Sequence, residues 1–161
     1  MNRVTHNFII RKLHILFLIL SLSVLTLTSC DHTDVDGIFV DHTIYENLSI
    51  PKRLELKKLI RQTLKKNENA LTTLNKFWCG GGAGCYDLGF IVTQIIYRIG
   101  EDEFLKIVMK LDREKLLGLE GLIAVGLEYG DNNKDGKIDN KKIETEFPKL
   151  YKVLSDKYNK N

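Results

Sequence analysis

Histidine is scarce in this sequence, and its placement limits the enzyme classes to which the chain can belong. Four of the 161 residues are histidines, and only His32 and His42 lie after residue 30. Both fall in a polar stretch that we expect to be a tether. The remaining chain therefore has no Ser-His-Asp order, and no pair of carboxylates stands in a recognisable catalytic motif. We expect a protein without enzymatic activity, with a catalyst built from Asp, Glu and Tyr as the open alternative.

The sequence also lacks an apolar run long enough to cross a membrane. Its longest run extends from Ile15 to Leu27 and contains small polar residues, whereas a membrane-spanning helix needs about 20 apolar residues. Three basic residues precede the run, and acidic residues, beginning with Asp31, follow it at once. A basic start before a short apolar segment is typical of a secretory signal peptide rather than of a transmembrane anchor.

Cysteine is rare as well, and the first of the three stands where the apolar run ends, in Leu27-Thr28-Ser29-Cys30. This tetrad resembles the lipobox of bacterial lipoproteins. The resemblance covers only this segment and implies that residues 1–29 are cleaved off and that Cys30 carries a lipid anchor, which holds stably when it has two or more acyl chains. It places the domain outside the cytoplasm, at the bacterial cell membrane or the outer membrane. Asp31 resembles an inner-membrane retention signal of enteric bacteria, but other bacteria read acids there differently, so both membranes stay open.

An excess of positive charge is absent from the predicted mature chain. Three of the 24 Lys and Arg residues precede Cys30, whereas all 21 Asp and Glu residues follow it, which leaves 21 charges of each sign. Nucleic-acid binding draws on a basic excess that neutralises phosphates. We therefore expect no nucleic-acid partner.

About 130 residues follow the predicted cleavage site, a length that suits one domain. Residues 30–49 are predicted to be the lipidated Cys and a polar tether, with a short apolar patch, 38–40, that can dock on the domain. Residues 50–161 are predicted to be a helical domain. A helix capped by Ser49 has an apolar stripe and a strongly basic opposite face. That face is interpreted either as solvated surface or as a contact with anionic lipid headgroups.

Further helices follow along the chain. The apolar stretch 88–99 predicts a central buried helix that Gly100 ends. A helix over 113–129 contains Gly118, Gly121 and Gly126, each costing about 1 kcal/mol against Ala, and close approach of a neighbouring helix is the expected compensation. A last helix should start near Pro148. The prediction is an all-α fold, a compact bundle of five or six short helices.

Cys79 and Cys85 enclose a glycine-rich segment and are the two cysteines that remain if Cys30 carries lipid. An oxidising compartment permits a disulfide between them, which would contribute about 2–3 kcal/mol on the chain-entropy model. Their spacing does not fit a thioredoxin-like pair, and the residues after the glycines do not fit a phosphate-binding loop. The flanking aromatic residues either form a rim for a partner or pack around the bridge.

Residues 131–142 resemble the calcium loops of EF-hand and dockerin proteins. The resemblance implies side-chain ligands at Asp131, Asn133, Asp135 and Asp139, a carbonyl ligand at Lys137, a turn at Gly136 and a buried side chain at Ile138. At the twelfth position, where the family has a bidentate Glu, this chain has Lys142, and Glu144 is the candidate replacement. We expect at most weak Ca²⁺ binding, in the range 10⁻⁴–10⁻³ M. The alternative is a polar turn without an ion.

These features favour a membrane-anchored lipoprotein whose helical domain binds a protein partner in the cell envelope. An immunity protein against a toxin delivered to the periplasm is one specific form, although no motif identifies it. Two alternatives stay open: a calcium-dependent structural or envelope-stress module, and an envelope hydrolase.

Overall fold

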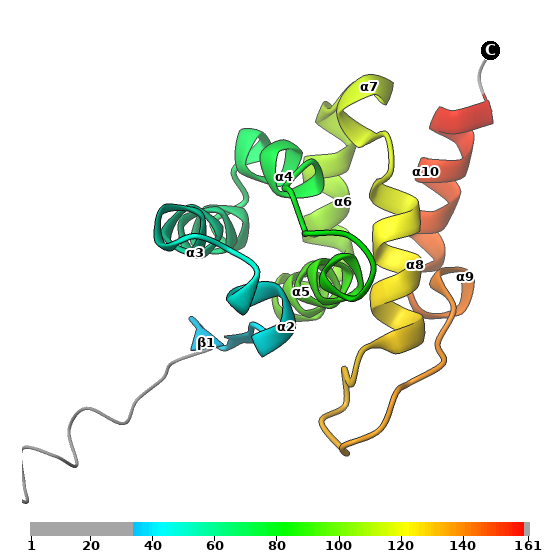
Figure 1. Ribbon diagram of the computed structural model, residues 1–161. Helices are drawn as coiled ribbons and strands as arrows, with labels where there is room; N and C mark the ends of the chain where they lie inside the picture. The colour runs from blue at the N-terminus through cyan, green and yellow to red at the C-terminus, as the bar shows by residue number, and fades with distance from the viewer. Residues whose placement is uncertain (1–33, 160–161) are drawn as a thin grey trace, which may run out of the picture. The chain divides into compact units, whose positions relative to one another are not determined.

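The computed structural model describes residues 34–159, and these fold as one compact unit (Figure 1). The predicted signal peptide, Cys30 and the first residues of the predicted tether lie outside the described residues. Within 34–159, no helix combines the length and the apolar character that crossing a membrane requires.

The described chain is mostly helical, which confirms the predicted all-α fold. A two-stranded antiparallel hairpin comes first, formed by β1 (Asp34–Val35) and β2 (Ile38–Phe39). Six longer helices follow among residues 34–159: α3 (Ile50–Leu64), α4 (Glu68–Asn75), α5 (Ala83–Ile99), α6 (Glu101–Lys110), α8 (Leu119–Tyr129) and α10 (Pro148–Asn159). Three short helices complete the set: α2 (His42–Glu46), α7 (Arg113–Leu116) and α9 (Ile143–Glu146).

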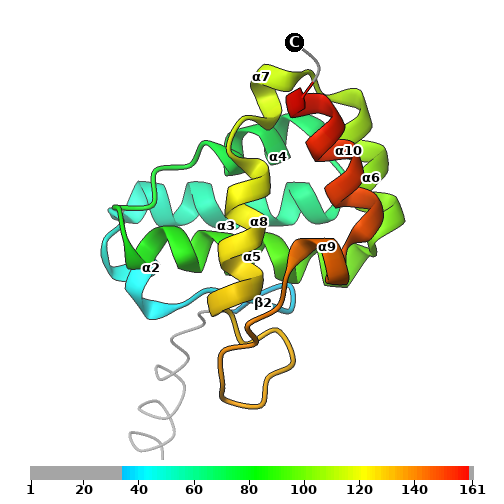
Figure 2. The same ribbon diagram turned by 90° about the vertical axis from the view of Figure 1, so that its right-hand side faces the viewer.

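Helix α5 lies at the centre of the fold, and α8 crosses directly over it (Figure 2). Its side chains from Ile91 to Ile96 are all buried, as the apolar stretch predicts. Gly89 of α5 faces Gly126 of α8, and a Cβ on Gly126 would overlap the carbonyl group of Gly89. The two glycines therefore let the helix backbones touch, which confirms the expected close approach at Gly126.

The remaining helices surround this crossed pair. Helix α3 packs against α4 and α5, and α10 packs against α6 and α9. Gly100 separates α5 from α6 and adopts φ 87°, a left-handed conformation that glycine accepts readily. Three acids occupy the first turn of α6, where negative charge is stabilised by the helix dipole.

The single helix predicted over 113–129 is divided in the structure. Gly118 adopts φ 86° in the left-handed region and ends α7 before α8 begins at Leu119. Gly121 lies exposed with open space around its Cα. Of the three glycines, Gly126 alone serves helix contact, while Gly118 makes a turn.

Residues 34–48, which the sequence assigns to the tether, belong to the folded unit. Val35, Ile38, Val40, Ile44 and Leu48 are each at most 3% exposed and join the core. Asp41 caps α2, with its Oδ1 accepting the Thr43 N–H at 2.9 Å. The docking expected for residues 38–40 is therefore part of a larger contact, and the folded unit includes residues well before 50.

Candidate functional site

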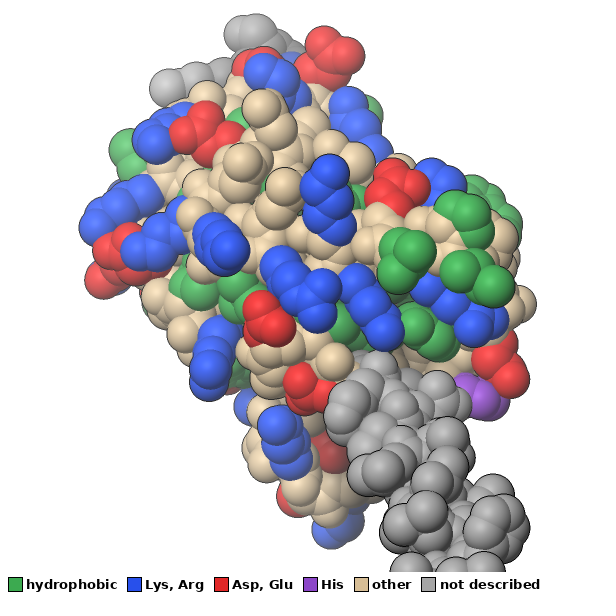
Figure 3. All heavy atoms as spheres, turned by 90° about the vertical axis from the view of Figure 1, so that its left-hand side faces the viewer, with side chains coloured by type: hydrophobic (Ala, Val, Ile, Leu, Met, Phe, Trp, Pro, Cys, Tyr) green, Lys and Arg blue, Asp and Glu red, His purple; other side chains and the backbone are tan. Residues whose placement is uncertain are grey.

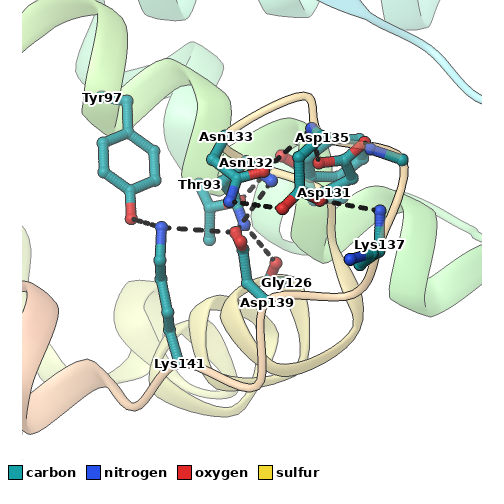
Figure 4. A network of polar contacts seen from close by, with 12 residues as sticks. Thr93, Tyr97, Gly126, Asp131, Asn132, Asn133, Asp135, Lys137, Asp139 and Lys141 are labelled. Carbon is teal, nitrogen blue, oxygen red and sulfur yellow. Dashed lines mark hydrogen bonds and ion pairs between the residues drawn. The ribbon is translucent and has the colours of Figure 1, made fainter.

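The loop after α8 is organised by its own carboxylate and amide side chains (Figure 4). Asp131 accepts the N–H groups of Asp135 at 2.9 Å and Gly136 at 2.8 Å. Asn133 accepts the Asp135 N–H at 3.0 Å, and Asp135 accepts the Lys137 N–H at 2.9 Å. Gly136 has φ 83°, so it makes the turn that the resemblance requires. The structure thus brings together the first three side chains of the predicted ligand set.

The later positions of the predicted ligand set are placed differently. Asp139 Oδ2 accepts the Asn132 N–H at 2.8 Å and lies 3.4 Å from Lys141 Nζ. Glu144 lies on α9, where it lines a hollow shared with Glu128 of α8. Ile138, expected to be buried, is 55% exposed, because the loop projects away from the helices (Figure 2). That expectation was wrong.

These positions give only a partial fit to a calcium ion. Across residues 34–159, no three His, Cys, Asp or Glu side chains lie close enough together to hold a metal ion. The donors that do converge are two carboxylates and one amide, from Asp131, Asp135 and Asn133. Calcium takes six to eight oxygens, so carbonyl groups and water would have to supply the rest.

Hydrogen bonds to α5 and α8 dock this loop on the helices beneath it. Thr93 Oγ1 of α5 donates to Asn132 Oδ1 at 2.8 Å, and Asn132 Nδ2 donates to the Gly126 carbonyl at 3.1 Å. Lys141 Nζ lies 3.5 Å from the Tyr97 hydroxyl. Burial, together with a hydrogen bond to Glu146, raises the pKa of Tyr97 well above its ordinary value. The Tyr97 hydroxyl therefore stays protonated at neutral pH.

Cys79 and Cys85 form the predicted disulfide, with their Cα atoms 4.9 Å apart. The bridge ties the incoming loop to the first turn of α5. A Cβ on Gly84 would overlap the Cys79 carbonyl, so the loop passes directly over this helix. Of the flanking aromatic side chains, Phe77 is buried, whereas Trp78 and Tyr86 are exposed.

The outer face of α3 carries the basic residues that the sequence predicts, and Figure 3 shows Lys and Arg side chains gathered there. Several of them are held in place. Lys52 pairs with Glu55 at 2.6 Å and Arg61 with Asp36 at 3.4 Å, while Lys66, just after the end of α3, pairs with Glu103 at 2.6 Å. Arg53 and Lys57 lie over the Tyr45 ring, 4.7 and 5.2 Å from its centroid.

Three large apolar side chains are exposed at the start of this helix. Ile50 is 72% exposed, Leu54 63% and Trp78 61%. Ile50 and Leu54 are one helical turn apart and share a face. The loop that carries Trp78 passes this end of α3, because Phe77 lies under Lys52, whose Nζ is 5.5 Å from the ring centroid. We call Ile50, Leu54, Trp78 and the basic residues of α3 the α3 surface.

A separate hollow of about 470 Å³ brings together residues that the sequence analysis did not connect. Four aromatic side chains line it, Phe39, Tyr86, Phe90 and Tyr129. They come from the hairpin, from α5 and from the end of α8, which lie far apart in sequence. No local motif predicts this aromatic cluster, since each of its residues alone looks like an ordinary core or surface residue.

Four carboxylates also line this hollow, from Asp34, Asp41, Asp87 and Asp131, together with one cation, Lys134. Asp87 Oδ2 accepts the Ile44 N–H at 2.9 Å, so it supports the start of α2 beside Asp41. Burial, and secondarily the nearby Asp41 charge, raise the pKa of Asp87 to about 6, against a lowering by the Ile44 N–H. The hollow is therefore acidic and aromatic.

Comparison of the chain with protein-family models, curated proteins and solved structures finds no significant match.

Proposed function

We propose that the protein is a membrane-anchored bacterial lipoprotein whose non-enzymatic helical domain binds an acidic protein partner in the cell envelope. The observation that carries this proposal is the α3 surface, where exposed Ile50 and Leu54 lie on the basic helix α3 and exposed Trp78 follows Phe77, whose ring lies under Lys52. Exposed apolar groups with a polar rim mark interaction sites on soluble domains, and tryptophan is prominent among the residues that dominate binding energy.

The lipobox-like tetrad supports the anchor, and the position of β1 gives the anchor a structural consequence. Cys30 precedes Asp34, the first residue of β1, by four residues. Four residues reach at most about 14 Å when fully extended. A lipid on Cys30 would thus hold the folded unit against the membrane surface, at the cell membrane or the outer membrane. The protein would therefore bind its partner at the membrane surface.

The arrangement of the α3 surface favours a protein partner over lipid headgroups. Some of its cations lie beside the acids Glu55 and Asp36, and others lie over the Tyr45 ring, so the surface carries a pattern of both charge signs rather than a uniform positive field. A protein with matching acids can use such a pattern, because electrostatic complementarity fixes the register of a complex. Headgroups of a fluid membrane need only the sum of the charges.

Site-specific photo-crosslinking in the living bacterium tests this proposal. A photoreactive amino acid replaces Leu54 in the full chain, and a second variant carries it at Leu117, which is exposed to the same extent directly after α7. We expect one discrete protein adduct from position 54 and none from position 117. Reversing the charges of Lys58 and Arg61 should abolish the adduct.

Two outcomes would overturn the proposal. Equal crosslinking from positions 54 and 117 would show random collisions rather than a binding surface. Adducts with lipid alone at position 54 would assign the α3 surface to the membrane and leave the protein partner without support.

We propose as a second function that the loop at 131–142 binds calcium weakly and braces the end of α8. The observation that favours it is the convergence of Asp131, Asn133 and Asp135. Asp139, Lys137 and Glu144 are the further candidate donors, and Glu144 lies on α9. Calorimetry should then show saturation in the range 10⁻⁴–10⁻³ M.

The matched variants for calcium are Asp135→Ala, which removes a donor, and Asn140→Ala, which lies in the loop outside the donor set. Loss of the signal in the first variant alone supports the site. A melting temperature unchanged by calcium or chelator, in every variant, would leave the loop as a polar turn.

A further inference from the structure

The hollow between the hairpin, α5 and α8 has the size of a small-ligand site. Its volume of about 470 Å³ falls in the range of pockets that hold small molecules. Gly130 belongs to its wall, and a Cβ there would overlap the Phe90 ring. The chain therefore keeps the end of α8 close to α5, which brings Tyr129 and Tyr86 together.

Exposed aromatic faces form one part of the wall. The Tyr86 and Tyr129 rings stack with centroids 4.8 Å apart, and both residues are 44% exposed. Phe39 and Phe90 form a second pair, with centroids 6.4 Å apart. The faces of such rings carry partial negative charge and attract cations within about 6 Å.

Carboxylates form the other part, and no cation of the described residues pairs with them. Within residues 34–159, none of Asp34, Asp41, Asp87 and Asp131 forms an ion pair. Asp41 and Asp87 each use one oxygen for a backbone N–H of α2, and the second oxygen of each has no hydrogen-bond partner among these residues. The charge of the wall is thus four acids against Lys134.

We propose that this hollow binds an organic cation bearing an ammonium or methylated ammonium group. Aromatic faces and carboxylates each stabilise such a group, whereas an anion would be repelled by four acids. The inference does not depend on the α3 surface or on its partner.

Lys134 is expected to compete with the ligand. Among residues 34–159 it is the one basic side chain that lines the hollow, and its backbone adopts φ 61°, so the loop turns sharply at this residue. A charge at this position opposes a second cation in the same hollow. Replacing Lys134 by Gln should therefore strengthen binding, while loss of an aromatic face or a carboxylate should weaken it.

Calorimetric titration of the full chain, in chelator so that the calcium loop is free of metal, tests the proposal. The probes are tetramethylammonium, methylammonium and N-acetyl-trimethyllysine amide, with neopentyl alcohol as a neutral compound of similar shape. We expect saturable binding of the cations and none of the alcohol. Comparable affinity for all cations indicates a free amine as ligand, and clear preference for the lysine derivative indicates a side chain of a protein; both outcomes support the site.

Matched variants locate the binding. Tyr129→Leu should weaken cation binding roughly 3- to 30-fold, the range that one cation–π contact provides, and Asp87→Asn should weaken it as well. Tyr151→Leu removes an aromatic side chain of α10 that lies outside the hollow, so this variant should bind the cations as the parent does. The proposal is overturned if no cation binds more tightly than about 10 mM, if the alcohol binds equally, or if Lys134→Gln weakens binding.

Discussion

The contact between Gly89 and Gly126 shows how single residues set the packing of the core. The sequence identifies Gly126 by its cost within a helix, but its partner Gly89 stands in an apolar stretch that gives no sign of a crossing point. Each glycine allows the other helix to approach to backbone contact. A side chain at either position would push α5 and α8 apart.

We predict opposite effects for two alanine substitutions in the same helix. Gly126→Ala should lower the free energy of unfolding by about 3 kcal/mol or more, since overpacking distorts the backbone. Gly121→Ala, at an exposed position with open space, should raise it by about 0.5–1 kcal/mol through helix propensity. Urea denaturation followed by circular dichroism measures both. Equal effects of the two substitutions would contradict backbone contact at Gly126.

A pH-dependent stability difference is expected at Asp87. Its pKa of about 6 in the folded protein lies above the ordinary 3.8, so the folded state holds this proton more tightly. Stability from this group is thus present below about pH 4 and is lost as pH rises toward 6. Asp41, Asp34, Asp131 and Lys134 are the charged groups that share its hollow.

Asp87→Asn should therefore be more stable than the parent at pH 7.5 and equally stable at pH 4. Asn keeps an acceptor for the Ile44 N–H, and we expect a gain on the order of 1 kcal/mol because Asp87 is only partly shielded from solvent. Thermal melts across this pH range provide the measurement, with exposed Asp156→Asn as control. A gain that persists at pH 4 would point to a cause other than ionisation.

Among the elements, the hairpin and α2 depart most from expectation. Their apolar side chains are separated by Asp, His and Thr residues, so the composition suggests a polar tether. In the structure, however, Val35, Ile38 and Val40 are all buried, because the hairpin turns these three side chains toward the core. The hairpin is buried by its contact with α5, which lies more than 40 residues further along the chain. There, Gln94 accepts the Phe39 N–H at 2.8 Å. Local pattern alone could not reveal it.

We predict that Ile44→Ala lowers the free energy of unfolding by about 2–5 kcal/mol, the usual cost of emptying a buried aliphatic site. Ile50→Ala, two residues after the end of the same segment but 72% exposed, should change it by less than about 0.5 kcal/mol. Chemical denaturation of both variants measures these free energies and shows whether residues 34–48 belong to the folded unit or form a tether. A tether would give two small effects.

The Cys79–Cys85 disulfide should stabilise the start of α5. Reduction, or the double change Cys79→Ser with Cys85→Ser, is expected to lower stability by about 2–3 kcal/mol on the chain-entropy model. Tyr86 and Asp87 directly follow Cys85 near the start of α5, so the same change should weaken cation binding. Calorimetry and denaturation of the oxidised and double-Ser forms test the two effects. An unchanged free energy of unfolding in the double-Ser form would show that the disulfide does not stabilise the fold.

For the whole molecule, the sequence predicts the fold class because the dominant signals are local. Helix spacing, Gly100 and Pro148 place most helices, and the disulfide follows from counting cysteines. The hollow could not be predicted, because Phe39, Tyr86 and Tyr129 meet only when three segments pack together. The same limit applies to the α3 surface, where a basic stripe is readable but its apolar neighbour Trp78 comes from another loop.

Mass spectrometry of the full chain expressed in a bacterium, after separation of membrane and soluble fractions, tests most directly whether the protein works at a membrane surface. We predict a membrane-bound product that begins at Cys30 and carries a diacylglycerol, and a Cys30→Ser variant that keeps residues 1–29. A mature chain without lipid in the soluble fraction would contradict the proposed anchor, and with it the proposal that the folded unit is held at the membrane surface.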